Sequence, residues 1–443
     1  MQLSSLLGHT QELLLLVRKS DKPADSVIDS FFRSRKYLGS HDRRFIAETT
    51  YGTLRHLRRC EELARVSVAG GPDGLPAEDI SLTTILAYLS RIEARTPLDP
   101  AVLQSLPKSP QLKSSFQDFL VRLPQAALET SGPVERLAVE FSLPNWLAER
   151  FVTQYGEEEA QKISESLNAP APLNLRVNTL NTTVEECQGR LRKEGVETVK
   201  TGLSPVGLAV AQRLNIFRLS VFREGLFEVQ DEGSQLLGVL LDPKPTFKVL
   251  DACAGAGGKT LHMAAIMKNR GEIVASDVNS FRLGELRKRA RRAAAFNVRV
   301  KSTEELLSEE GLDRFFDIVF LDSPCSGIGT LRRNPGLKWS IRESDLEELR
   351  AKQLHILETH HRFVKDQGLL FYATCSLLPE ENEGILEDFL NRHPEYSPVD
   401  LAAYAAKSGL SGFIANGYFK LFPHKQGTDG FFCGAVQRTG KSA

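Results

Sequence analysis

Residues 249–265, VLDACAGAGGKTLHMAA, decide the fold of the larger part of this chain. A short apolar run typical of a β-strand leads into a glycine-rich turn, and the pattern after the turn is helical. The free N–H groups at the start of such a helix face a ligand. Two familiar sites do not fit, since a Walker P-loop needs glycine where Cys253 stands. A dinucleotide fingerprint needs a small residue where Thr260 stands.

The same strand-then-helix pattern returns further along the chain. Apolar, β-rich runs occur in FKVLDA (247–252), GEIVASD (271–277), DIVFLD (317–322) and GLLFYATC (368–375), with helical stretches between them. Such alternation predicts an α/β domain with a parallel sheet and helices on both of its faces. We expect this domain to cover residues 236–443.

The remainder of the chain predicts two further domains. Residues 1–135 have apolar side chains at three- and four-residue spacing, with a break at 39–40, and we expect a helical domain there. Residues 136–235 contain a predicted strand, LNLRVNTL (173–180), and an amphipathic helix over 182–195. This combination is typical of a small α+β module, for which the sequence indicates no chemistry of its own, and we expect it to bind RNA.

Composition limits the class of protein. The 443 residues include 56 Lys and Arg against 56 Asp and Glu. A uniformly cationic protein that coats nucleic acid is therefore excluded, and any nucleic-acid-binding site must be a local patch. The six cysteines are scattered and form no CxxC pair, which favours a reducing compartment. The first apolar run is too short for a signal peptide, and no stretch reaches the roughly twenty apolar residues of a membrane span. We expect a soluble, cytoplasmic protein.

Asp277 is the last residue of the second predicted strand, and it is a second candidate contact for the ligand of the glycine turn. An acid at this position reaches a ribose hydroxyl in doubly wound folds. A nucleoside ligand without a pyrophosphate fits both features, and S-adenosylmethionine is such a ligand. The alternative is that Asp277 caps the helix expected over 281–295.

Two cysteines lie at the ends of the next strands. Cys325 stands in DSPCSGIGTLRRNP (322–335) and Cys375 in ATCSLLPEENE (373–383). Carbon 5 of cytosine is a poor nucleophile until a thiolate adds at carbon 6, so two thiols beside a cofactor pocket have a specific use. For each cysteine alone, the other interpretation is a small buried hydrophobic residue.

The glycine turn, the Cys325 motif and the Cys375 motif together resemble the Nop/Sun family of RNA 5-methylcytosine methyltransferases. The likeness extends over roughly residues 137–438. The segment GSHDRRFIAETTYGTLR (39–55) resembles the NusB-like helical RNA-binding domain of the bacterial RsmB type. The resemblance implies a Rossmann-like class I domain that uses S-adenosylmethionine. Within the motifs, GA at 255–256 and DSPC at 322–325 differ from the family's usual CAAPGGKT and DAPC.

The resemblance also implies the role of each site residue. Cys375 would be the nucleophile, Cys325 would assist proton removal and release, Asp322 would support the cytosine ring, and Lys259 would lie at the active-site edge. The implied cofactor-binding residues are Cys253, Ala254, Gly255, Ala256, Gly257, Gly258, Lys259, Asp277, Arg282, Asp322 and, where the family expects an aspartate, Glu304.

Three further segments were considered for binding. The basic run over 282–301 is similar to a phosphate-contacting helix face, and Arg332 and Arg333 are candidates for the active-site rim. QLHILETHHRF (353–363) fits no helical metal motif, so we interpret it as a helix surface. PEENE (379–383) reads as the start of a helix.

Three functions remain open from the sequence. The first is methylation of carbon 5 of a cytosine in 16S ribosomal RNA or its small-subunit precursor by a monomer that needs no metal and no membrane. The second is a DNA cytosine methyltransferase in which Cys325 is the nucleophile. The third is a non-catalytic RNA-binding factor in ribosome assembly.

Overall fold

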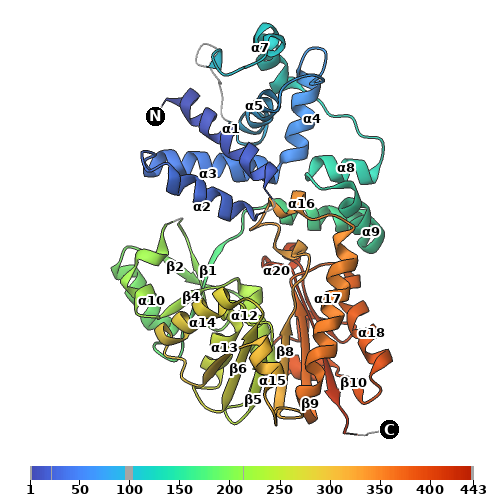
Figure 1. The fold of residues 1–443 in the computed structure, drawn as a ribbon. Coiled ribbons are helices and arrows are strands. Elements are labelled where there is room, and N and C mark those ends of the chain that lie inside the picture. The colour runs from blue at the N-terminus through green and yellow to red at the C-terminus, as the bar shows by residue number, and fades with distance from the viewer. Residues whose placement is uncertain (1, 21, 95–102, 213, 441–443) are drawn as a thin grey trace. The chain divides into compact units, whose positions relative to one another are not determined.

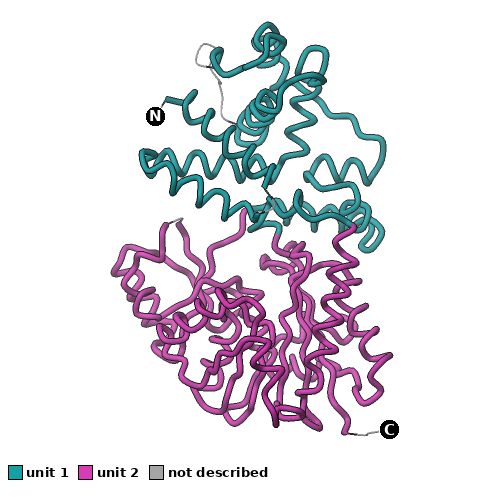
Figure 2. Tube along the Cα trace, viewed as in Figure 1, with its two compact units in different colours: residues 1–169, 331–343 teal, residues 170–330, 344–443 magenta. Residues whose placement is uncertain are grey.

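The computed structural model describes residues 2–20, 22–94, 103–212 and 214–440. The chain forms two compact units, which Figure 2 distinguishes by colour. The first, called the helical unit here, comprises Met1–Ala169 and Leu331–Glu343. The second, called the α/β unit, comprises Pro170–Thr330 and Ser344–Ala443. The division into three domains at 135 and 235 stays a prediction.

The helical unit confirms the predicted break at 39–40, since α3 begins at Ser40. The apolar positions before residue 124 pack into a core that includes Leu7, Leu14 and Ile85, each with no exposed surface. Its helices (Figure 1) are α1 (Leu3–Lys19), α2 (Ala24–Ser34), α3 (Ser40–Arg55), α4 (Leu57–Ser67), α5 (Ala77–Ala87), η1 (Tyr88–Ile92), α7 (Pro110–Arg122), η2 (Leu123–Gln125), α8 (Pro133–Glu140), α9 (Asn145–Asn168) and α16 (Leu337–Ser340).

The segment 331–343 follows the Cys325 motif in sequence but packs within the helical unit. Lys338 is 1% exposed and donates to the backbone oxygen of Arg55 and to Asn168 Oδ1, both at 2.7 Å. Burial holds the pKa of Lys338 well below its usual value. Trp339 Nε1 donates to the Leu54 oxygen at 2.7 Å. Arg332 is largely buried, with 8% of its surface exposed, and its place at the active-site rim stays a prediction.

The α/β unit begins with a small antiparallel sheet in the order β2-β3-β1-β4. The predicted strand 173–180 and helix 182–195 are confirmed as β1 and α10. The elements of this part, called the small module here, are β1 (Leu173–Val177), α10 (Val184–Lys193), β2 (Thr198–Lys200), β3 (Gly207–Val210), η3 (Ile216–Arg218), α11 (Ser220–Arg223) and β4 (Phe227–Val229).

A mixed sheet forms the centre of the unit, in the order β11-β12-β13-β9-β8-β5-β6-β7, with β10 paired to β13. Its strands are β5 (Lys248–Asp251), β6 (Glu272–Asp277), β7 (Val298–Ser302), β8 (Phe316–Asp322), β9 (Val364–Thr374), β10 (Tyr396–Pro398), β11 (Ile414–Ala415), β12 (Tyr418–Leu421) and β13 (Phe431–Arg438). All four predicted strands are present, and β5 to β9 are parallel.

The expectation of a wholly parallel sheet is wrong at one edge. Strand β13 runs antiparallel to β9 and to β12. The connection over 422–430 between β12 and β13 is shorter than the dozen or more residues that a parallel crossover needs, so these two strands pair antiparallel. Strand β7 was not predicted, because its sequence, VRVKS, reads as part of the basic run.

Helices cover the mixed sheet (Figure 1). They are α12 (Glu232–Leu241), α13 (Gly258–Ile266), α14 (Ser280–Arg292), α15 (Thr303–Ser308), α17 (Asp345–His360), α18 (Glu383–Arg392), α19 (Leu401–Ala406) and α20 (Pro423–Gln426), with short turns η4 (Ile328–Thr330), η5 (His361–Phe363), η6 (Pro379–Glu381) and η7 (Ser411–Phe413). In the described parts of the chain, no helix is long and apolar enough to cross a membrane.

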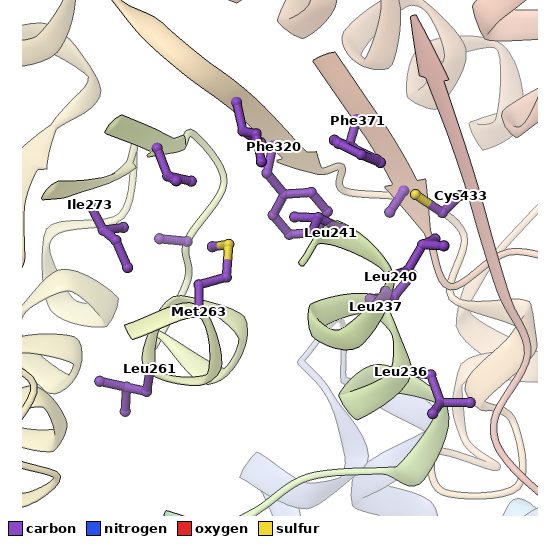
Figure 3. Close-up of a cluster of buried hydrophobic side chains, with 14 of the residues drawn as sticks. Leu236, Leu237, Leu240, Leu241, Leu261, Met263, Ile273, Phe320, Phe371 and Cys433 are labelled. Carbon is purple, nitrogen blue, oxygen red and sulfur yellow. The ribbon is translucent and has the colours of Figure 1, made fainter. Parts of the chain in front are cut away.

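A hydrophobic cluster holds α12 and α13 near the sheet (Figure 3). Leu237 and Leu240 of α12 belong to the same buried cluster as Phe320 of β8 and Phe371 of β9, and all four are at most 1% exposed. Burial of each such side chain contributes about 1.5–3 kcal/mol. The core thus fixes the strand ends from which the site is built.

Candidate active site

The glycine turn links β5 to α13 in a fixed conformation. Thr260 Oγ1 donates to Asp251 Oδ2 at 2.6 Å, which ties the helix to the strand end. Gly257 has φ +86°, and a Cβ there would lie 2.6 Å from Leu286 Cγ, so only glycine fits. Cys253 is half-buried, and burial together with the nearby carboxylates raises the pKa of its thiol.

Asp277 joins this turn to the end of β6. Its Oδ2 accepts from the Gly255 N–H at 2.9 Å and its Oδ1 from the Asn279 N–H at 2.8 Å. Asn279, which accepts from the Arg282 N–H at 3.1 Å, is the residue that caps α14. The alternative that Asp277 is that cap is therefore wrong.

The turn has room and donors for an S-adenosylmethionine carboxylate and ribose. A Cβ added to Gly255 would meet no atom within 4 Å. The start of α13 receives no side-chain cap, so its first N–H groups are available to an anion. Arg282 and Glu304 are exposed in the first turns of α14 and α15, next to the ends of β6 and β7. The residues present fit the cofactor.

The two cysteines meet beside an ion pair. Cys325 Sγ lies 3.4 Å from Cys375 Sγ, and Lys259 Nζ lies 2.5 Å from Asp322 Oδ2. Contact with Cys375 and burial raise the pKa of Cys325 well above its usual value. Burial lowers the pKa of Lys259, but Asp322 and then Cys375 outweigh this effect and raise it. The structure thus brings together all four residues that the family resemblance assigned to catalysis.

Glu381 is a site residue that the sequence did not indicate. It has no exposed surface and accepts from the Ser326 N–H at 2.8 Å and from Ser326 Oγ at 2.5 Å. It also accepts from Ser376 Oγ at 2.5 Å and from Gln353 Nε2 at 3.0 Å. The two serines directly follow Cys325 and Cys375, so one carboxylate holds both cysteine loops.

PEENE was interpreted as a helix start with acids in the first turn, and α18 does begin at Glu383. Its third residue, Glu381, instead points inward, where Ser326 and Ser376 supply donors. PEENE also belongs to the Cys375 motif that carries the family resemblance, but the sequence indicates no partner for Glu381.

The small module contacts the glycine turn directly through the buried Arg176 and indirectly through Glu228, which pairs with arginines of α14. Arg176 of β1, 2% exposed, donates to the Gly258 oxygen at 2.5 Å. Arg289 of α14 donates to the Ala256 oxygen at 2.8 Å and pairs with Glu228 of β4 at 2.9 Å. Glu228, 3% exposed, also pairs with Arg292. The small module, for which the sequence indicates no chemistry of its own, therefore supports the glycine turn.

The same contacts correct the prediction of a continuous basic helix face over 282–301. Helix α14 ends at Arg292, and Arg299 and Lys301 belong to β7, where they pair with Glu272 and Glu309. Part of the basic run therefore makes contacts within the chain, and the pairing of Lys301 with Glu309 is of the kind expected with the acids after it, whereas contact of the exposed arginines with phosphate stays a prediction.

Comparison with known proteins agrees with this geometry. The family described as 16S rRNA methyltransferase RsmB/F matches residues 238–437, and the ferredoxin-like domain of RsmF/B-like methyltransferases matches residues 143–217. A probable ribosomal RNA small subunit methyltransferase B of Bacillus subtilis is 28% identical over 99% of this chain and all of its own length. A ribosomal RNA small subunit methyltransferase B of Pectobacterium carotovorum is 30% identical over 90% of this chain and 91% of its own.

Among solved structures, a methyltransferase homolog protein from Pyrococcus horikoshii is 29% identical, with a TM-score of 0.58. It covers 70% of this chain and 100% of its own. With the sheet, the glycine turn and these relatives in agreement, the chain belongs to the RsmB/F family of S-adenosylmethionine-dependent small-subunit rRNA methyltransferases.

Proposed function

We propose that this chain methylates carbon 5 of a cytosine in 16S rRNA through a covalent bond between Cys375 and carbon 6 of the ring. The observation that carries the proposal is the pair of thiols 3.4 Å apart next to the Lys259–Asp322 ion pair. Methylation of an exocyclic nitrogen or of an oxygen needs no nucleophilic thiol, so a pair of them favours a carbon target.

The reaction would run in balanced steps. The Cys375 thiolate bonds to carbon 6, and the electron pair displaced from the ring makes carbon 5 nucleophilic. Carbon 5 would then bond to the electrophilic methyl group that bound S-adenosylmethionine supplies, and the methyl–sulfur bond of the donor would break, so that S-adenosylhomocysteine leaves. A base then takes the proton from carbon 5, the electrons of that bond restore the ring double bond, and the Cys375–C6 bond breaks.

The charged groups around the two cysteines support a different role for each of them. Cys375 is one of the groups that raise the pKa of Lys259, so the proposed nucleophile has a cationic side chain close to it. Cys325 lies beside the Cys375 sulfur, and contact with Cys375 and burial raise its pKa, which makes its thiolate the stronger base; Cys325 would therefore assist removal of the carbon 5 proton and release. Asp322 and Lys259 would hold the cytosine ring at the same edge.

The cofactor residues follow from the turn. Residues 253–259 and Asp277 would bind the methionine and ribose parts of S-adenosylmethionine, with Arg282 and Glu304 at the rim. A target cytosine must leave its stack for carbon 6 to be reached, which favours an unpaired position in the RNA.

The test compares wild-type protein with Cys375→Ala and Cys325→Ala, using tritiated S-adenosylmethionine and transcribed 16S RNA. We expect Cys375→Ala to abolish transfer and Cys325→Ala to accumulate a protein–RNA adduct on a denaturing gel. Cys187→Ala, which changes a buried thiol of the small module, is the matched control and should retain transfer.

Two results would overturn the proposal. An adduct in Cys375→Ala and none in Cys325→Ala would make Cys325 the nucleophile, the order expected of a DNA-type enzyme. Absence of transfer by the wild type to RNA and to DNA would favour the non-catalytic assembly factor.

A further inference from the structure

A cluster of histidine and glutamate side chains lies at the ends of α17 and α18, apart from the residues assigned to catalysis. Glu358 is in the last turn of α17, His361 opens η5, and His393 follows the last residue of α18. The two helices run side by side (Figure 1). One ligand atom of each side chain lies within 4.8 Å of the other two.

The sequence did not predict this cluster, because the spacing of its histidine and glutamate residues matches no helical metal motif. The stretch QLHILETHHRF was interpreted as a helix surface, which is wrong for His360, since this side chain is 4% exposed. Glu358 and His361 become neighbours at the helix end, and His393 reaches them from a point 32 residues beyond His361 in the chain.

His393 has a carboxylate at each ring nitrogen. Its Nε2 lies 2.7 Å from Glu358 Oε2, and its Nδ1 lies 3.2 Å from Glu395 Oε1. In metal sites, a ligating imidazole typically gives its second N–H to a carboxylate, which fixes the ring orientation. Glu395 stands where such an orienting carboxylate belongs.

His361 adds a nitrogen that has no other use. Its Nδ1 is buried without a hydrogen-bond partner in the described structure, and the nearest carboxylate oxygen, Glu395 Oε1, is 4.0 Å away. A buried, unpaired ring nitrogen is costly unless a ligand satisfies it.

From this geometry we infer that Glu358, His361 and His393 form a binding site for a borderline divalent cation of the zinc class, with Glu395 as the orienting carboxylate. Two imidazoles and one carboxylate are a ligand set that Zn²⁺ accepts, with water at the remaining position. Ligand atoms on a tetrahedral Zn²⁺ are about 3.3 Å apart. The observed separations of up to 4.8 Å therefore call only for small side-chain movements.

The bound cation would stabilise a helix that supports the active site. Gln353 of α17 donates to the Pro324 oxygen at 3.1 Å and to Glu381. Joining the end of α17 to the end of α18 would therefore stiffen the support of the Cys325 loop, although the cation takes no part in methyl transfer. The inference does not depend on the proposed cytosine chemistry.

The test uses the full chain, treated with a chelator and titrated with Zn²⁺ by calorimetry. We expect one Zn²⁺ per chain, a rise in Tm on binding, and at least tenfold weaker binding in His361→Ala and in His393→Ala. Glu395→Gln should weaken binding about tenfold, as loss of an orienting carboxylate does elsewhere. His355→Ala, which removes an exposed histidine from the same helix, is the matched control and should bind like wild type.

The two active-site thiols could also bind Zn²⁺, so the ligands must be identified directly. With Co²⁺ in place of Zn²⁺, ligation by nitrogen and oxygen gives no thiolate charge-transfer band, and we expect none. A thiolate band, or unchanged binding in Glu358→Gln with native circular dichroism, would assign the metal elsewhere. No binding by the wild type would overturn the inference and leave His393 only as a hydrogen-bonding partner of Glu358 and Glu395.

Discussion

Glu381 offers the sharpest test of how the cysteine loops are held. It accepts four hydrogen bonds, from the N–H and hydroxyl of Ser326, from Ser376 and from Gln353. In Glu381→Gln, the amide oxygen can keep the two N–H donors, and the amide NH₂ can donate to the two hydroxyl oxygens. Each partner keeps a hydrogen bond to the side chain, but the negative charge is lost, and the two serine hydroxyls lose the carboxylate as the acceptor of their own protons.

The size of the effect follows from this count. A hydrogen bond to a charged group is worth about 1 kcal/mol more than a neutral one. Glu381→Gln should therefore lower the free energy of unfolding by about 2–4 kcal/mol. In Glu381→Ala, the Ser326 N–H and Gln353 Nε2 lose this buried acceptor at about 1–3 kcal/mol each, in addition to the cavity.

The activity should change in kcat more than in KM for S-adenosylmethionine, because no hydrogen bond of Glu381 reaches the glycine turn. A fall in kcat of about tenfold corresponds to 1.4 kcal/mol of lost positioning. Urea unfolding and steady-state methyl transfer measure the two effects. Glu387→Gln, at an exposed position of α18, is the matched control. Wild-type kcat and stability in Glu381→Gln, or a change confined to KM, would refute the reasoning.

Two further substitutions test the contacts that support the glycine turn. Glu228→Gln should lower the free energy of unfolding by about 2 kcal/mol and weaken S-adenosylmethionine binding, because Arg289 and Arg292 lose a buried counter-charge. The loss stays this small because both arginines are about one-fifth exposed, so water compensates for part of it. Urea unfolding and calorimetry measure this, with Glu185→Gln at an exposed ion pair as an unaffected control. Burial raises the pKa of Asp251 from 3.8 to about 7, so the folded state holds a proton that the unfolded state has released, and stability falls as pH rises from about 4 to 7. Asp251→Asn should remove that part of the slope in unfolding experiments across this pH range, and an unchanged slope would contradict it.

The sequence was informative wherever local pattern and structure coincide. The strands that end in Asp251, Asp277, Asp322 and Thr374 were all predicted, because each is a short apolar run between polar turns. Carboxyl ends of parallel strands share one edge of a sheet, and the cysteines therefore came together as expected. The small strand and helix after residue 173 were found for the same local reason.

Contacts between distant segments could not be predicted from pattern. Glu381 reads as a helix-start acid until the donors of Ser326 and Ser376 are placed beside it. Arg289 and Arg292 read as exposed charge until Glu228 of the small module reaches them. In each case a single sequence gives the charge of a residue but not the partner that decides whether it is buried.

The unpredicted antiparallel edge of the sheet also bears on the chemistry. Strand β13 pairs with β9, and Gly430 just before it donates its N–H to the Gly329 oxygen at 2.8 Å, while the Gly329 N–H donates to the Cys375 oxygen at 2.9 Å. A Cβ on Gly329 would lie 2.4 Å from the Gly430 oxygen, so these backbones meet too closely for any side chain. The loop after Cys325 is therefore fixed by backbone contacts on one side and by Glu381 on the other. If the two sulfurs, 3.4 Å apart, act in the proposed reaction, they need such a double constraint, because a displacement of about 1 Å would cost on the order of a hundredfold in rate.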